Sequence, residues 1–182
     1  MKPALIFIIG TIAQLYLLIM LLRFWLPWVR ADFRNPIAQG ILRLTSPLVI
    51  PVRRVLPPIG RLDTATIIVA FGLQYLAILV ILSISGVASG IVPIATTALI
   101  DMVLLTLQLF KFAIFIHIIL TWVAPGAYNP ATAFISMLVE PVMRPFRKII
   151  PVIGGLDISP VFAIIALQAG GIFIATLRPL PI

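Results

Sequence analysis

The stretches PLVIPVRRVLPPIGRLDTAT, residues 47–66, and PVMRPFRKIIPVIGGLDISP, residues 141–160, are related by an offset of 94 residues. Prolines, an arginine, a glycine and an aspartate coincide at this offset without a gap. The coinciding pairs are Pro47 and Pro141, Pro51 and Pro145, Arg53 and Arg147, Pro57 and Pro151, Gly60 and Gly154, and Asp63 and Asp157. Such residues coincide by chance far less often than Leu and Ile do in apolar segments, so we predict an internal duplication.

The same register extends to both sides of these stretches. It matches Asn35 with Asn129, Pro36 with Pro130, Gln14 with Gln108, and Gln74 with Gln168. We therefore expect two repeats, residues 1–93 and 94–182, each made of a helix, a loop and a second helix.

The composition places this duplication in a membrane. Of 182 residues, 62% are hydrophobic and only 10% are charged, and the mean hydropathy is +1.24. A soluble domain carries roughly a quarter charged residues, so this chain has too few to cover a water-facing surface. That argues against an ordinary cytosolic enzyme. The absence of cysteine excludes disulfides, thiolate nucleophiles and Cys-ligated zinc.

Apolar runs of the length needed to cross about 30 Å of hydrocarbon predict four transmembrane helices in an all-α membrane protein. We expect them at about residues 3–25, 65–85, 98–123 and 159–177. The first run is longer than a signal-peptide core and ends at Arg23 with no small-residue cleavage site, so we expect a retained helix.

Basic residues set the expected topology. Nine of the thirteen Lys and Arg residues fall in the two long loops, 28–63 and 124–157, and the turn between the second and third spans has none. The positive-inside rule then predicts cytoplasmic loops and places both termini on the outer side of the membrane.

Each loop shows a moderately clear amphipathic helical pattern. Asn35-Pro36 and Asn129-Pro130 place a capping side chain before a proline at the first helical position. Prolines 47, 51, 141 and 145 predict that each loop forms two short helices or one kinked helix. We expect Arg43, Arg53, Arg54, Arg144, Arg147 and Lys148 to bind anionic lipid or a partner. The alternative is that they only anchor the loops and control topology.

Asp63 and Asp157 directly precede the second and fourth spans. A carboxylate there caps free N–H groups and meets the positive end of the helix dipole, which we take as the main role. Ion pairs with the basic residues of the same loop are the alternative.

Several polar side chains fall inside the expected spans: Gln14, Gln74, Asp101, Gln108, Lys111 and Gln168. Glutamine amides hydrogen-bond between transmembrane helices, so the four glutamines are expected to join the two repeats; a polar path is the alternative. Lys111 is the most suggestive, because a charge at this depth is costly. Helical spacing puts Asp101, Gln108 and Lys111 on one face.

No catalytic site emerges from the sequence. Five acidic residues and one histidine leave no nucleophile–base pair and no metal-ligand triad. We expect no enzymatic activity and no cofactor.

The segment from Pro141 to Pro160, with its first-repeat partner from Pro47 to Asp63, resembles the hallmark of the YggT/YlmG family of small membrane proteins. The resemblance covers essentially the whole chain and fits the two-copy bacterial members. The first copy departs from it by having Gly60-Arg61 where the second has Gly154-Gly155. The family implies a bacterial inner membrane or chloroplast membrane, and roles in division or nucleoid organisation, cytochrome-complex assembly, or osmotic and ion homeostasis.

Two functional hypotheses follow. The first is a non-enzymatic scaffold or assembly factor that uses its basic loops to engage anionic phospholipid and a membrane protein partner or a second copy, with no direct contact to nucleic acid. The second is a small oligomeric channel or ion-homeostasis protein with Asp101, Lys111 and the glutamines along a path.

Overall fold

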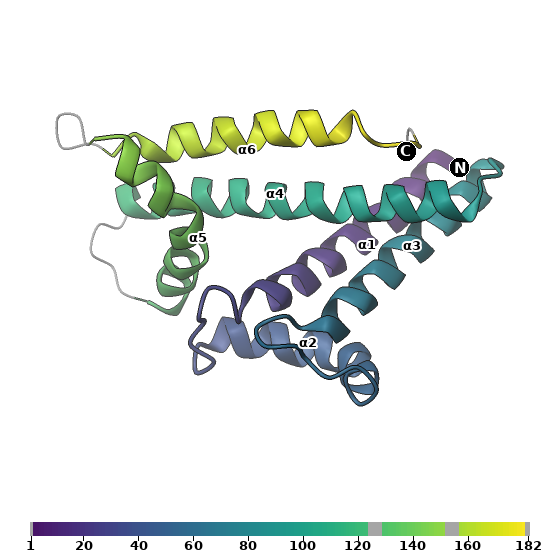
Figure 1. Cartoon of the computed structure of the whole chain (residues 1–182), viewed down its shortest axis with the longest axis horizontal. Helices are drawn as coiled ribbons and strands as arrows, with labels where there is room; N and C mark the ends of the chain where they lie inside the picture. The colour runs from purple at the N-terminus through teal and green to yellow at the C-terminus, as the bar shows by residue number, and fades with distance from the viewer. Residues whose placement is uncertain (1, 124–128, 152–156, 181–182) are drawn as a thin grey trace.

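The computed structural model describes residues 2–123, 129–151 and 157–180, and within these ranges the fold is all-helical, with six helices and no β-strand (Figure 1). The helices are α1 Lys2–Trp25, α2 Pro36–Arg53, α3 Thr64–Ser85, α4 Ile91–Val123, α5 Pro130–Ile149 and α6 Ser159–Ala175. The sequence-based prediction of an all-α protein is confirmed.

The helices form two antiparallel pairs that diverge from a common end. α1 packs beside α3, and α4 packs beside α6 (Figure 1). Both chain termini and the turn between α3 and α4 lie at the common end. At the other end, α2 lies across the first pair and α5 lies across the second, and α2 and α5 touch each other.

Three helices have the length and composition to cross a membrane: α1, α3 and the Ile91–Thr121 part of α4. The chain therefore has the makeup of a membrane protein. α6 is also apolar but has 17 residues, about 26 Å at 1.5 Å per residue. It falls slightly short of the hydrocarbon thickness, so the fourth span stays a prediction.

The third expected span begins earlier than the sequence suggested. We expected a helix from about residue 98 because Gly90 and Pro93 precede it, but α4 begins at Ile91. Pro93 lies in the first turn, where a backbone N–H has no intrahelical acceptor, so its missing donor costs nothing.

The loop prolines do not divide the loop helices. α2 continues through Pro47 and Pro51, and α5 continues through Pro141 and Pro145, so each loop forms one helix rather than two. All four prolines are exposed. The hydrogen bonds that they remove therefore cost less than they would in a buried helix, and packing on the opposite side holds the helix together.

Most of the core lies where the helix pairs meet the loop helices, and a smaller cluster joins α3 to α4 near the common end. The largest cluster joins the end of α1 to α2, α4, α5 and α6, and includes Leu21, Leu26, Ile41, Phe110 and Phe134. Elsewhere large apolar side chains are exposed along the long helices, for example Phe7, Phe112 and Phe173. A water-soluble protein rarely exposes so much contiguous apolar surface, and lipid is the solvent that suits it.

Candidate functional site

The two loop helices begin at equivalent caps that are joined to each other. The Asn35 side chain accepts a hydrogen bond of 2.9 Å from the Ile37 N–H, and Asn129 accepts bonds of 2.9 Å from the N–H groups of Ala131 and Thr132. The Asn35 amide also donates to the Pro130 carbonyl oxygen at 2.7 Å. This bond fixes the beginning of α2 against the beginning of α5.

An ion cluster joins α1, α2 and α3; we call Arg23, Arg53 and Asp63 the first ion cluster. Arg53 forms an ion pair with Asp63. Asp63 also accepts hydrogen bonds from the N–H of Thr66 at 3.3 Å and from its hydroxyl at 2.7 Å. It therefore caps α3 and pairs with Arg53 at the same time. Its side chain is only 6% exposed.

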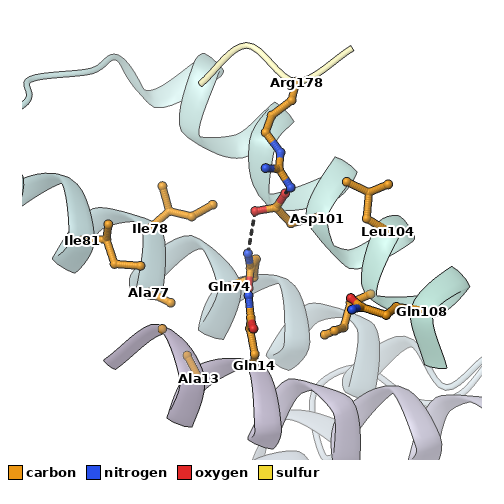
Figure 2. Close-up of a pocket in the computed structure, with 12 residues that line it drawn as sticks. Ala13, Gln14, Gln74, Ala77, Ile78, Ile81, Asp101, Leu104, Gln108 and Arg178 are labelled. Carbon is orange, nitrogen blue, oxygen red and sulfur yellow. Dashed lines mark hydrogen bonds and ion pairs between the residues drawn. The ribbon is translucent and has the colours of Figure 1, made fainter. Parts of the chain in front are cut away.

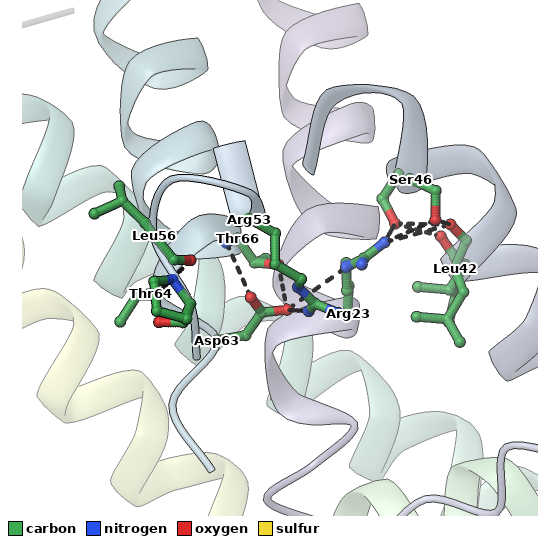
Figure 3. A network of polar contacts seen from close by, with 11 residues as sticks. Arg23, Leu42, Ser46, Arg53, Leu56, Asp63, Thr64 and Thr66 are labelled. Carbon is green, nitrogen blue, oxygen red and sulfur yellow. Dashed lines mark hydrogen bonds and ion pairs between the residues drawn. The ribbon is translucent and has the colours of Figure 1, made fainter. Parts of the chain in front are cut away.

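Arg23 was missed by the sequence analysis, which treated it as the end of an apolar run. Its side chain is 4% exposed, and Nε lies 3.7 Å from Asp63. Nη1 donates to acceptors on α2: Thr45 Oγ1 at 2.8 Å, Ser46 Oγ at 3.3 Å and the Leu42 carbonyl at 3.3 Å. Figure 3 shows the guanidinium between Asp63 and α2. A basic residue at the end of a span was the available signal.

The second repeat has a corresponding ion cluster that is more exposed. We call Glu140, Arg147 and Asp157 the second ion cluster. Arg147 donates to Asp157 at 3.1 Å and to Glu140 at 3.0 Å. Asp157 accepts hydrogen bonds from the N–H of Ser159 at 2.9 Å and from its hydroxyl at 2.6 Å. Each of the three charged side chains is more than a third exposed, so these ion pairs are worth less than buried ones.

The hydrogen bonds to Asp157 change its titration. Partial burial alone would raise the pKa of Asp157, but the hydrogen bonds from Ser159 and Arg147 outweigh burial and hold the pKa below its ordinary value. The carboxylate therefore stays ionised at neutral pH.

At the repeat position of Arg23 the second half has His117, whose Nδ1 lies 3.5 Å from the Ser136 hydroxyl.

The six loop residues that the sequence predicts to bind lipid or a partner separate into two groups. Arg53 pairs with Asp63, which caps α3, and Arg147 pairs with Asp157, which accepts hydrogen bonds from Ser159 at the start of α6. Arg43, Arg54 and Lys148 are exposed and have no ion partner within the described ranges, and Arg144 lies 3.6 Å from Glu140 on the same helix. Arg43, Arg54 and Lys148 therefore have no carboxylate in the described ranges that would compete with an external anion.

The other motif residues shape the turns. The Pro57 carbonyl accepts a hydrogen bond of 2.9 Å from the Thr64 hydroxyl. Gly60 has a φ of +61°, a left-handed conformation that favours glycine. Pro151 is exposed. Gly154 lies outside the residues that the structure describes.

A second polar site lies among α1, α3 and α4. Asp101 forms an ion pair with Arg178, which follows α6, and accepts a hydrogen bond of 3.0 Å from the Gln74 amide. Figure 2 shows Asp101 between these two partners. They line a cavity of about 190 Å³ together with Gln14 and Gln108. The sequence analysis treated Arg178 as an isolated terminal charge and so missed this ion pair.

Lys111 does not join that cavity. Its ammonium donates to the Gln168 side chain, so α4 is tied to α6 here. Spacing along α4 suggested a shared face for Asp101, Gln108 and Lys111, but Asp101 pairs with Gln74 and Arg178, whereas Lys111 pairs with Gln168. Of the four glutamines, Gln74 and Gln168 bind charged groups, whereas Gln14 and Gln108 make no side-chain hydrogen bond within the described ranges.

Comparison with known proteins gives the family. The profile of the CCB3/YggT family matches the chain twice, over residues 3–84 and 96–178. The chain belongs to the CCB3/YggT family. It is 44% identical to "Uncharacterized protein PA0392" of Pseudomonas aeruginosa over 92% of this chain and 86% of that protein. It is 32% identical to "Uncharacterized protein YggT" of Escherichia coli K12 over 88% of this chain and 84% of that one.

A plant protein matches a shorter part of the chain. "YlmG homolog protein 2, chloroplastic" of Arabidopsis thaliana is 35% identical over 35% of this chain and 25% of its own length. No solved structure matches the chain. The names of these relatives refer to no enzymatic activity. In the described ranges, no group of three or more acidic, His or Cys side chains could hold a metal ion.

Proposed function

We propose that this protein is a non-enzymatic scaffold or assembly factor of the inner membrane, which engages anionic phospholipid and a membrane protein partner, or a second copy, through α2 and α5. The observation that carries the proposal is the group of exposed basic residues on these helices, Arg43, Arg54 and Lys148, which have no ion partner in the described part of the chain. Nucleic acid is not a direct ligand in this proposal.

The proposed placement has four spans, with α6 as the fourth. α6 packs along α4 and exposes apolar side chains such as Phe162, Ile165 and Phe173, a surface that suits lipid. A slight tilt of neighbouring helices or local thinning of the bilayer accommodates its length. α2 and α5 then lie in the cytoplasmic interface, and both termini are periplasmic, as the positive-inside rule requires.

In this placement the loop helices have both features of an interfacial helix. Leu44 and Leu48 of α2 are exposed apolar side chains suited to acyl chains, while Arg43 and Arg54 are exposed cations suited to phosphates. Arg53 and Arg147 have a different role, because they hold the ends of α2 and α5 on Asp63 and Asp157. They set the orientation of the helix that presents the other cations.

The test separates the loss of the exposed cations from a loss of folding. A triple variant with Arg43, Arg54 and Lys148 replaced by Gln should insert and fold normally but lose its crosslinked partners and its anionic lipid in native membranes. The control is Lys2→Gln, which removes an exposed charge at the opposite end of α1. Equal crosslinking by the triple variant and the control would refute the proposal.

A second candidate function rests on the cavity around Asp101. A carboxylate, a guanidinium and three glutamines line this cavity within the apolar helices, and polar groups at this depth are typical of ion or solute paths. The candidate is a small oligomeric channel or ion-homeostasis protein. Flux through reconstituted protein that is abolished by Asp101→Asn, but not by Lys111→Met outside the cavity, would favour this function over the scaffold.

A further inference from the structure

A separate cavity of about 310 Å³ lies beside the first ion cluster. The end of α1, the helix α2 and the turn before α3 surround it. Its charged lining consists of Arg23, Arg53, Arg61 and Asp63, so three arginines and one aspartate line the cavity. An excess of positive charge around a cavity favours an anionic ligand.

Asp63 uses hydrogen bonds from Arg53 but none from Arg23. Its oxygens are engaged by Thr66 and Arg53. Arg23 approaches only to 3.7 Å, beyond hydrogen-bond distance. The carboxylate therefore caps α3 and leaves positive charge in the cavity.

Arg23 has donors left over. All three of its hydrogen bonds start from Nη1. Its Nε is buried without a hydrogen-bond acceptor, and Nη2 makes no hydrogen bond within the part of the chain that the structure describes. A buried donor on a charged group is costly to leave unsatisfied. An anionic oxygen in the cavity would satisfy it.

A tight turn carries Arg61 beside the cavity. Ile59 and Leu62 exchange two backbone hydrogen bonds of 3.0 Å, and Gly60 takes the left-handed conformation that this turn needs. Arg61 is exposed and has no ion partner in the described ranges. It is therefore free to close on a ligand held by Arg23.

We propose that this cavity binds a phosphate group, with Arg23 and Arg61 as its principal donors and Arg53 as a further positive charge. Planar guanidinium groups match phosphate oxygens in pairs of hydrogen bonds. This inference rests on the proposed function and names one specific site and chemical group for the anionic lipid. The group is either the phosphodiester of a lipid headgroup or free phosphate.

An aromatic cluster beside the cavity favours the headgroup as the source. Phe24, Trp25 and Trp28 pack together at the end of α1, with ring centroids 5.4 to 6.5 Å apart. Aromatic residues gather where spans meet the headgroups, so the cavity lies at that level.

At the repeat positions of Arg23 and Arg61 the second half has His117 and Gly155. We therefore expect one such site per chain.

The site is tested by titrating the full chain in detergent with short-chain phosphatidylglycerol and following tryptophan fluorescence. Arg61→Gln should weaken the apparent Kd about tenfold, the equivalent of one charge-assisted hydrogen bond. The matched control is Arg34→Gln, which removes an exposed arginine of the same loop that does not line the cavity. We expect this control to bind within about twofold of the wild type, because it loses only screened surface charge.

The arms of the titration separate the outcomes. Displacement of the lipid by inorganic phosphate would support a site that also takes free phosphate, and no displacement would support a headgroup site. An equal loss of lipid affinity in Arg61→Gln and Arg34→Gln would overturn the proposed site, but it would still agree with general lipid binding by the basic residues. Failure of the wild type to bind phosphatidylglycerol at all would overturn both this inference and the lipid part of the proposed function.

Arg23→Lys provides a second variant with the charge retained. It keeps the positive charge, now on an ammonium, but removes the planar guanidinium donors, so we expect weaker binding with little change in salt dependence. Binding equal to the wild type would contradict the role of the Arg23 guanidinium. Helical content measured by circular dichroism shows whether the variant has folded.

Discussion

The side-chain amide of Asn35 donates a hydrogen bond of 2.7 Å to the carbonyl oxygen of Pro130. Asn35 is buried, and its oxygen caps α2 while its nitrogen reaches the first residue of α5. One side chain therefore begins one loop helix and positions the other. Because α2 and α5 carry the exposed cations, this bond also sets how the two basic surfaces lie relative to each other.

Asn35 should therefore matter more than its repeat counterpart. Asn35→Ala removes both the cap and the link to α5, whereas Asn129→Ala removes a cap alone. A cap contributes about 1 kcal/mol, and we expect Asn35→Ala to cost about 1 kcal/mol more than Asn129→Ala, the value of one further hydrogen bond. Unfolding in mixed micelles measures both. Equal costs would show that the bond to Pro130 contributes nothing.

The two aspartates should also differ. Asp63→Asn leaves Arg23 and Arg53 without their carboxylate in a buried site, and breaking a buried ion pair costs about 3 kcal/mol or more. Asp157→Asn breaks an exposed pair, for which we expect a loss below about 1 kcal/mol. The free energy of unfolding of the two variants gives the comparison. A larger effect at Asp157 would contradict the burial argument.

The lowered pKa of Asp157 predicts a specific pH dependence. Since the folded pKa lies below its unfolded value of about 3.9, the ionised group stabilises the folded state above that value. This stabilisation is lost as the pH falls through the folded pKa. The difference in unfolding free energy between the wild type and Asp157→Asn should therefore be constant near neutral pH and shrink below about pH 4. A difference that grows on acidification would have the wrong sign.

The pair of Asp101 and Arg178 is open to a double-mutant cycle. Arg178→Gln leaves the Asp101 carboxylate without its counter-ion among the apolar helices, which we expect to cost about 3 kcal/mol. The double variant with Asp101→Asn should be more stable than Arg178→Gln, because no unpaired charge remains. Additive costs in the cycle would show that the two side chains are not coupled.

The sequence predicted features that depend on local spacing. Asn35 and Asn129 were identified as caps because each precedes a proline, and both side chains accept hydrogen bonds from the following backbone. Asp63 and Asp157 lie just before α3 and α6, and each accepts hydrogen bonds from the first turn of the helix that follows it. Caps are made within a few residues, so they can be predicted without knowing the tertiary packing.

Features that depend on packing between distant helices could not be predicted. Lys111 lies beside Gln168, and Asp101 lies beside Arg178, because α4 and α6 run side by side in a particular register. Neither the spacing along one helix nor the repeat fixes that register. The buried position of Arg23 likewise depends on α2 crossing α1, which brings the acceptors of Thr45 and Ser46 to it.

Site-specific photocrosslinking tests the central claim most directly. A crosslinker at Leu44, exposed on α2, and a control crosslinker at Ile12, exposed on α1, are compared in native membranes with and without the triple Arg43, Arg54 and Lys148 to Gln change. The scaffold account predicts a defined protein or anionic-lipid adduct from position 44 that falls to background in the triple variant, while adducts from position 12 do not change. An adduct from position 44 that is equally abundant in both backgrounds would contradict it.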